Sequence, residues 1–213
     1  MLLLFCKFTI FFPQKGGKNI LFIKFASKSP IGMQKEHTHD LLAKFAYCPV
    51  CGSPRFATRD FKSKRCPDCG FEFYLNSAGS VVCILLDGAG NILVSRRAFE
   101  PQKGTLDFPG GFVDADESLE QAVRREMREE TGLDVNPLRW LFSLPNRYLY
   151  SGLVIPTVDN FFLCQASRDA AAKPHDDVAE LLWLPLATLQ PQQFGLASMR
   201  TAIPKLQALF TEK

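Results

Sequence analysis

The chain has 213 residues, of which 46% are hydrophobic and 22% are charged. This length accommodates one well-packed domain of about 130 to 150 residues with a small unit beside it, and the composition is that of a soluble globular protein. Five lysines and no acid fall in residues 1–32, so the basic excess behind the formal charge of +3 belongs to that segment. The remainder has 20 basic and 22 acidic residues, which gives no support to a broad basic patch for nucleic acid.

Residues 1–32 form an apolar and basic leader. Its apolar run ends at Phe12, contains a lysine and is followed by Pro, Gly and Lys, so it is too short and too broken to span a bilayer. A signal peptide needs positive charge before the apolar run and small residues after it, and neither is clear here. We expect a dispensable segment, with the working chain beginning near Met33; the alternative is a tail that associates with a membrane or a partner.

Two CxxC pairs follow within residues 47–74. Each stands in a Cys-Pro-X-Cys-Gly frame, and 14 residues separate the pairs. The alternatives are chance and a redox motif, but two matched frames favour four thiolates around a structural Zn²⁺, a closed shell with no open position. We therefore expect a small zinc ribbon over residues 33–76, with four ligands: Cys48, Cys51, Cys66 and Cys69.

Two further cysteines indicate the compartment. Cys83 and Cys164 stand in apolar, strand-like runs, where a free thiol behaves as a small hydrophobic side chain. The cysteine pattern does not resemble the disulfide framework of a secreted protein. We therefore expect a cytoplasmic protein without a membrane partner.

Residues 77–213 have the pattern of one larger domain. Apolar runs at residues 80–87 and 92–97 flank the sequence DGAGN, which is a hairpin signal. Further apolar runs follow an intervening helical segment, and residues 196–210 again have helical spacing. Strands, a helix, more strands and a closing helix predict an α/β fold with a mixed sheet covered by helices.

The intervening segment, residues 118–131, carries start and stop signals of a helix. Ser118 is a suitable N-cap, Gln121 completes a capping box, and Gly132 is a natural C-terminal stop. Helical spacing puts the apolar residues on one stripe that faces the core. These residues are Leu119, Ala122, Val123 and Met127.

Three carboxylates, Glu126, Glu129 and Glu130, share a second stripe near the C-terminal end of this helix. Like charges at this spacing repel, and negative charge opposes the helix dipole there. Arg125 offsets part of the repulsion through a pair with Glu129. The cluster is then either a solvated, salt-bridged face or an oxygen-only site for Mg²⁺ or Mn²⁺ ions that bridge to substrate phosphates.

The spacing resembles the Nudix box. Gly111, Glu117 and the run REMREETGL from Arg125 match every defined position of that pattern. The resemblance covers residues 77–213 and implies a Nudix-type mixed β-sheet sandwiched by helices. It also implies hydrolysis of a nucleoside diphosphate linked to another group, with Mg²⁺ or Mn²⁺ as the catalytic cofactor.

The same resemblance implies roles for individual residues. Either Glu126 or Glu129 accepts the proton of the attacking water, and the resemblance does not choose between them. Arg125 belongs to the catalytic group as the partner of Glu117 that orients the helix. The implied metal ligands, which include a loop carbonyl and a later loop acid, are Gly110, Glu126, Glu129, Glu130 and Asp177.

A four-cysteine ribbon before such a domain resembles the NADH pyrophosphatase branch of the family. Residues 143–151, SLPNRYLYS, keep the register of that branch's substrate-binding signature, while Asn146-Arg147 replaces its Trp-Pro pair. This departure puts NADH specificity in doubt and leaves the hydrolytic centre intact. The implied substrate contacts, with loop or surface positions as the alternative, are Tyr74, Arg97, Lys103, Ser143, Arg147, Tyr148 and Ser151.

The combined expectation is a metal-dependent hydrolase that cleaves the pyrophosphate bond of an NAD(H)-like or ADP-ribose-like substrate and releases a nucleoside monophosphate. Two alternatives stay open: a Nudix and zinc-ribbon module that binds a nucleotide or RNA without cleaving it, and a hydrolase of nucleotide-capped RNA. The expected partner is a small-molecule nucleotide, because the charge gives little support to nucleic acid. Ribbon-bearing relatives are often dimers, so the resemblance allows a homodimer.

Overall fold

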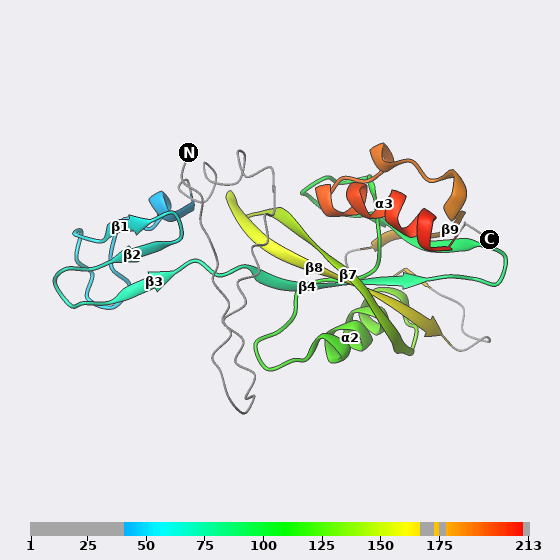
Figure 1. Ribbon diagram of the computed structural model, residues 1–213, viewed down its shortest axis with the longest axis horizontal. Helices are drawn as coiled ribbons and strands as arrows, with labels where there is room; N and C mark the ends of the chain where they lie inside the picture. Colours follow the sequence, from blue (N-terminus) through cyan, green and yellow to red (C-terminus); the bar gives the residue numbers. More distant parts are fainter. Residues whose placement is uncertain (1–40, 167–172, 175–177, 211–213) are drawn as a thin grey trace, which may run out of the picture.

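The computed structural model describes residues 41–166, 173–174 and 178–210. The expected leader, residues 1–32, and the expected ligand Asp177 lie outside these ranges. Figure 1 shows a small three-stranded sheet at one end of the molecule and a larger β-rich body with a helix on each side. Among the described residues, no helix is both long enough and apolar enough to cross a membrane.

The small sheet holds the CxxC pairs together. Its strands pair antiparallel in chain order: β1 (Ala57–Asp60), β2 (Ser63–Arg65) and β3 (Glu72–Tyr74). Its apolar core is made by Cys48, Phe56 and Cys66, with Phe71 and Phe73 packed against them. A core of this size stabilises little by itself, so this sheet needs another source of stability.

The larger body contains two three-stranded sheets. The first has the order β4-β8-β7, with β8 parallel to β4 and antiparallel to β7: β4 (Ala78–Leu85), β7 (Val135–Tyr150) and β8 (Leu153–Ala166). The second has the order β6-β5-β9 and is antiparallel: β5 (Asn91–Arg97), β6 (Leu106–Asp107) and β9 (Val178–Pro185). The helical elements are α2 (Leu119–Thr131), η1 (Leu186–Thr188), η2 (Pro191–Gln193) and α3 (Ala197–Phe210).

The predicted hairpin between the first two strands of the body is only partly formed. The turn is present, since the Asp87 N–H donates to the Asn91 carbonyl at 3.0 Å and the Asp87 carboxylate accepts from the Asn91 N–H at 2.8 Å. Beyond it, a single bridge joins Leu86 to Ile92. β4 then pairs with β8 and β5 pairs with β9, so the predicted hairpin is limited to the turn and this one bridge, because each strand forms its main pairing with another strand.

β4 contributes to two cores because its side chains alternate between the two faces of the strand. Val82 and Ile84 pack in one core with Ile203 of α3. Cys83 packs in the other core with Val123 of α2. Figure 1 shows these two helices on opposite sides of the β-rich body, so the predicted mixed sheet between helices is confirmed.

Candidate active site

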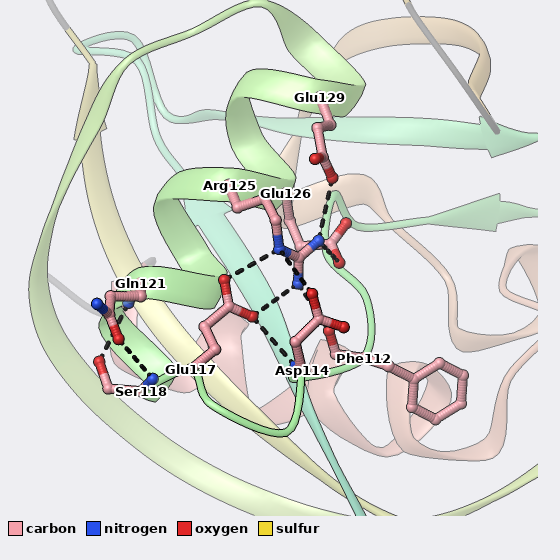
Figure 2. Close-up of polar contacts among 8 residues, drawn as sticks. All are labelled: Phe112, Asp114, Glu117, Ser118, Gln121, Arg125, Glu126 and Glu129. Carbon is pink, nitrogen blue, oxygen red and sulfur yellow. Dashed lines mark hydrogen bonds and ion pairs between the residues drawn. The ribbon is translucent and has the colours of Figure 1, made fainter.

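α2 begins and ends where the sequence predicts. The Ser118 hydroxyl accepts a hydrogen bond from the Gln121 backbone N–H at 3.3 Å, and the Gln121 side-chain carbonyl accepts one from the Ser118 N–H at 2.8 Å (Figure 2). Gly132 adopts a left-handed φ of 71° and its N–H donates to the Arg128 carbonyl. The core-facing residues are Ala122, Val123, Met127 and Thr131. Their burial fixes the rotation of the helix and therefore the direction of its glutamate stripe.

The loop before α2 lies close to both β4 and the helix. The Gly111 carbonyl accepts from the Val81 N–H at 2.9 Å, and the Gly110 N–H donates to Glu130 Oε2 at 2.9 Å. A Cβ atom on Gly111 would lie 2.4 Å from Glu126 Oε1. Only glycine leaves room for the loop to approach the helix carboxylates so closely.

Arg125 binds the surrounding carboxylates through all three guanidinium nitrogens. Its Nε and Nη2 donate to the two oxygens of Glu117 at 3.0 and 2.8 Å, and Nη2 also donates to the Phe112 carbonyl at 2.9 Å. Its Nη1 donates to Glu126 at 2.7 Å and to Glu129 at 3.0 Å (Figure 2). Arg125 therefore offsets the repulsion between the α2 glutamates, and a cation that binds Glu126 and Glu129 competes with Nη1.

Two glutamates that Arg125 contacts, Glu126 and Glu117, have pKa values shifted in opposite directions. Burial raises the pKa of Glu126, although Arg125 counteracts part of this effect. Hydrogen bonds from Arg125 lower the pKa of Glu117. The negative charge on Glu126 is therefore costly in the folded protein, and a second cation beside it would relieve that cost.

We expect Glu117→Gln to lower the free energy of unfolding near neutral pH, because ionised Glu117 stabilises the fold through Arg125. Folding lowers the pKa of Glu117, so its contribution is present above the unfolded value of about 4.3 and is lost as the pH falls through the lower folded-state pKa. Urea unfolding of both proteins from about pH 7 to about pH 3 checks this linkage. A stability difference that stays constant or grows toward acid pH would contradict it.

The α2 carboxylates line one side of a pocket of about 380 Å³, a size that suits a nucleotide-like ligand. The loop at residues 110–112, strands β4 to β9 and the start of α3 contribute to its other walls. The expected site residues that line it are Arg97, Gly110, Arg125, Glu126, Glu129, Glu130 and Tyr148. The structure thus brings most of the expected metal ligands into one cavity with two of the expected substrate contacts.

Arg97 is held in place by its neighbours within this pocket. It forms an ion pair with Asp107 at 2.7 Å and donates to the Tyr148 hydroxyl at 3.0 Å and the Pro101 carbonyl at 2.7 Å. Burial opposes its charge, but Asp107 and Tyr148 more than offset this, so the pKa of Arg97 is raised. Asp107 and the Pro101 carbonyl hold the Arg97 guanidinium, and this guanidinium in turn positions the Tyr148 hydroxyl.

The other expected substrate contacts lie apart from the pocket. Ser143 and Arg147 stand on β7 at positions that alternate with Tyr148, so the strand turns them toward the opposite face. Ser151 is exposed at the turn between β7 and β8, with a positive φ of 49°. Lys103 is exposed in the loop after β5, and the hydroxyl of Tyr74, on the ribbon sheet, donates to Glu72.

The pocket is also lined by five buried polar residues that were not predicted from the sequence: Ser95, Asp107, Asn146, Thr157 and Asp159. Asn146 had one sequence signal, since it stands two residues before Tyr148 on the same strand. Thr157 and Asp159 stand together on β8, whereas Ser95 of β5 pairs with Asp107 of β6, so the meeting of these residues depends on strand register.

The family follows from the domain comparison. The sequence profile described as "NUDIX domain" matches residues 77–206, more than half of the chain. The chain belongs to the Nudix family. The observed α2 with its preceding loop is therefore a Nudix box in its expected folded form.

Curated relatives of this Nudix chain include two bacterial proteins named "NAD-capped RNA hydrolase NudC". That of Stutzerimonas stutzeri is 32% identical over 102 residues, which are 48% of this chain and 36% of the relative. That of Deinococcus radiodurans is 28% identical over 152 residues, 70% of this chain and 52% of the relative. This chain thus spans about half or less of the length of these relatives.

Solved Nudix structures share the fold. A NUDIX hydrolase from Nitrosomonas europaea superposes with a TM-score of 0.57 at 20% identity, covering 76% of this chain and 92% of that one. The MutT protein from Methanosarcina mazei Go1 gives a TM-score of 0.53 at 23% identity, covering 64% and 96%. At such identities the likeness concerns the fold alone.

The donor atoms of the Nudix box suit hard divalent cations. Its carboxylates and the Gly110 carbonyl are oxygen donors, which Mg²⁺ and Mn²⁺ prefer. Arg125 Nη1 donates to both Glu126 and Glu129, so these two carboxylates would hold a cation in competition with a positive charge that is already in place.

The ribbon cysteines form a second candidate metal site. Among the described residues, they are the group of metal-ligating side chains whose ligand atoms all lie within 4.8 Å of one another.

Proposed function

We propose that this chain is a divalent-cation-dependent hydrolase that cleaves the pyrophosphate bond of an NAD(H)-like or ADP-ribose-like substrate and releases a nucleoside monophosphate. The observation that carries this proposal is the meeting of the α2 glutamates and the Gly110 loop in one nucleotide-sized pocket. A pure binding module has no need for this set of acids. The names of the NudC relatives point to the same class of bond.

Each residue of the site has its own role in the proposed reaction. Glu126, Glu129, Glu130 and the Gly110 carbonyl would hold Mg²⁺ or Mn²⁺, which would supply charge neutralisation of the diphosphate and make the attacking water more acidic. Glu126 or Glu129 would accept a proton from the attacking water. Arg125 acts as a positioning residue: Glu117 and the Phe112 carbonyl hold its guanidinium beside Glu126 and Glu129.

A substrate screen tests the proposal. Purified protein with Mg²⁺ or Mn²⁺ is offered NADH, NAD⁺, ADP-ribose and dinucleoside polyphosphates, and the release of nucleoside monophosphate is measured by chromatography. We expect release from at least one of the NAD(H) or ADP-ribose substrates and none with excess chelator. If none of the compounds is cleaved, the proposal fails.

A second candidate is hydrolysis of nucleotide-capped RNA, which the names of the relatives support. RNA carrying a 5′ NAD cap, compared with triphosphate RNA of the same sequence, separates this activity from that on free NAD. Because phosphate contacts make RNA binding salt-dependent, a steep loss of activity with salt on the capped RNA alone would favour this candidate.

A homodimer and a cytoplasmic location are further proposals. The six cysteines of the described ranges form no disulfide, which supports a reducing compartment.

We also propose that the ribbon holds a structural Zn²⁺. The sulfurs of Cys48 and Cys69 lie 3.7 Å apart and those of Cys51 and Cys66 lie 3.6 Å apart. Tetrahedral Zn–S bonds of about 2.3 Å would place sulfurs about 3.8 Å apart, so the spacing fits this ion. The turns that follow the two CxxC pairs have the same geometry. Gly52 and Gly70 both have a positive φ, and the backbone N–H of each donates to the carbonyl of the first cysteine of its pair.

Removing this zinc should unfold the ribbon while the Nudix domain keeps its structure. Zinc binding commonly supplies about 10 to 16 kcal/mol to a small module, and the ribbon has little apolar core to replace it. Hydrogen exchange with and without a strong chelator measures protection separately in residues 47–74 and in α2. Cys66→Ser should lose the bound zinc, whereas Cys164→Ser, a matched change outside the cluster, should keep it. Equal zinc content in both variants would contradict the proposed site.

A further inference from the structure

The pocket contains a buried polar atom that has no partner. Asn146 is 7% exposed and lines the pocket. Among the described residues, its Oδ1 is one of two buried side-chain atoms without a hydrogen bond; the other belongs to Ser63 of the ribbon. Leaving a buried acceptor unpaired costs free energy, and folded proteins pair nearly all such atoms. Asn146 therefore marks a position where a ligand donor is expected.

The strand register places Asn146 within a polar floor of the pocket. Asn146 lies opposite Thr157 on β8, and Asp159, two residues further along β8, lies opposite Ser80 of β4. All four residues line the pocket. Ser80 also bridges to Phe112 in the loop before α2. The floor is therefore continuous with the backbone that approaches the metal-binding carboxylates.

The hydroxyl groups of this floor present acceptors to a ligand. Ser80 and Thr157 donate to Asp159 Oδ1 at 2.5 and 2.6 Å, and Ser198 donates to Asp159 Oδ2 at 2.5 Å. A hydroxyl has one hydrogen, so Ser80 and Thr157, which line the pocket, offer a ligand only their lone pairs. Together with the unpaired Asn146 carbonyl and the Asp159 carboxylate, they make the floor rich in hydrogen-bond acceptors, and the Asn146 amide nitrogen is the one side-chain donor among these four residues.

We infer that this floor, with Asn146 as its specificity-determining residue, receives an N–H₂ group of the substrate base. The adenine amino group and the nicotinamide carboxamide both carry this donor. The inference rests on the proposed function and deepens it by naming the part of the substrate that the pocket recognises. A carbonyl or phosphate oxygen is a poor fit, because it would bring lone pairs to a set of acceptors. Tyr148, on the same face of β7, offers an aromatic surface beside the floor and packs edge-on against Phe112.

Equilibrium binding of mononucleotides tests the subsite without requiring turnover. AMP and IMP differ at the purine 6-position, an amino group in one and a carbonyl in the other. Nicotinamide mononucleotide and nicotinic acid mononucleotide differ at the carboxamide nitrogen. With Mg²⁺ present, calorimetry should show that the amino member of one pair binds about tenfold or more tightly, because its partner leaves buried polar groups unpaired. The pair that discriminates identifies the base that occupies the floor.

Two matched variants assign the discrimination to Asn146. Asn146→Leu removes the amide at similar size and should bring the affinity ratio of the discriminating pair close to one. Asn136→Leu makes the same change at an exposed position of the same strand and should keep the wild-type ratio. Thermal melts confirm that each variant is folded. A ratio that survives in folded Asn146→Leu overturns the role of Asn146.

The wild-type comparison stands even if Asn146→Leu does not fold. Equal affinities within both pairs, or no binding of any of the four nucleotides, overturn the inference. Hydrolysis of NAD⁺ and ADP-ribose on the same preparations judges the proposed function separately. Turnover without discrimination between the bases contradicts the base subsite and leaves the proposed hydrolase activity standing. Discrimination in binding without turnover contradicts the hydrolase activity and leaves the subsite standing.

Discussion

Glu126→Gln lowers the turnover of the cleaved substrate by at least about a hundredfold, the scale expected when a site loses a proton acceptor or its electrostatic support for the metal. Glutamine has almost the same shape and can still accept a hydrogen bond from Arg125, so the geometry of the helix is kept. Burial raises the pKa of Glu126, which means that its charge does not stabilise the metal-free fold. Steady-state kinetics at several Mg²⁺ concentrations, with thermal melts, should therefore show low activity in a fully stable protein.

Glu120→Gln is the matched control for this prediction. Glu120 lies in the first turn of the same helix, is exposed and does not belong to the pocket lining given by the described residues. It should retain wild-type turnover. Full activity of Glu126→Gln, or an equal loss in both variants, would mean that the α2 carboxylates do not carry the reaction.

The helix that bears these carboxylates could be predicted from sequence because its determinants are local. The bounds of α2 depend on Ser118, Gln121 and Gly132, all within or next to the helix, and each forms the predicted contact. The direction of the glutamate stripe depends only on helical periodicity and on the apolar stripe beside it. The predicted pair of Arg125 with Glu129 is confirmed at 3.0 Å for the same reason.

The polar floor could not be predicted in this way because its members meet through strand register. Ser80 and Asp159 are 79 residues apart in the chain and touch because β4 runs parallel to β8. A one-residue change in that register would turn Asp159 toward the opposite face. The SLPNRYLYS resemblance pointed to Ser143, Arg147, Tyr148 and Ser151. Of these four only Tyr148 lines the pocket, and the alternation of β7 turns Asn146, which was not predicted, toward the same face.

Gly110→Ala has the largest expected effect on stability. Gly110 has a φ of 144°, and a Cβ atom there would lie 2.1 Å from the Val81 carbonyl oxygen. L-residues rarely adopt this φ, and the clashing atom belongs to the backbone of β4, whose neighbouring side chains fill both cores. The variant must therefore displace a buried strand or the loop, and we expect a loss of about 3 kcal/mol or more in the free energy of unfolding, measured in urea.

Gly111→Ala is the matched comparison, since it adds the same methyl group one residue later. There the clash is with the carboxylate of Glu126, at 2.4 Å from Oε1, and the end of a side chain can move where a backbone strand cannot. We therefore expect Gly111→Ala to keep most of the stability and to raise the Mg²⁺ concentration needed for half-maximal activity. Equal destabilisation by the two changes would show that the loop yields as a unit. An unchanged Mg²⁺ requirement in Gly111→Ala would contradict the expectation that the closeness of this loop to Glu126 matters for the proposed metal site.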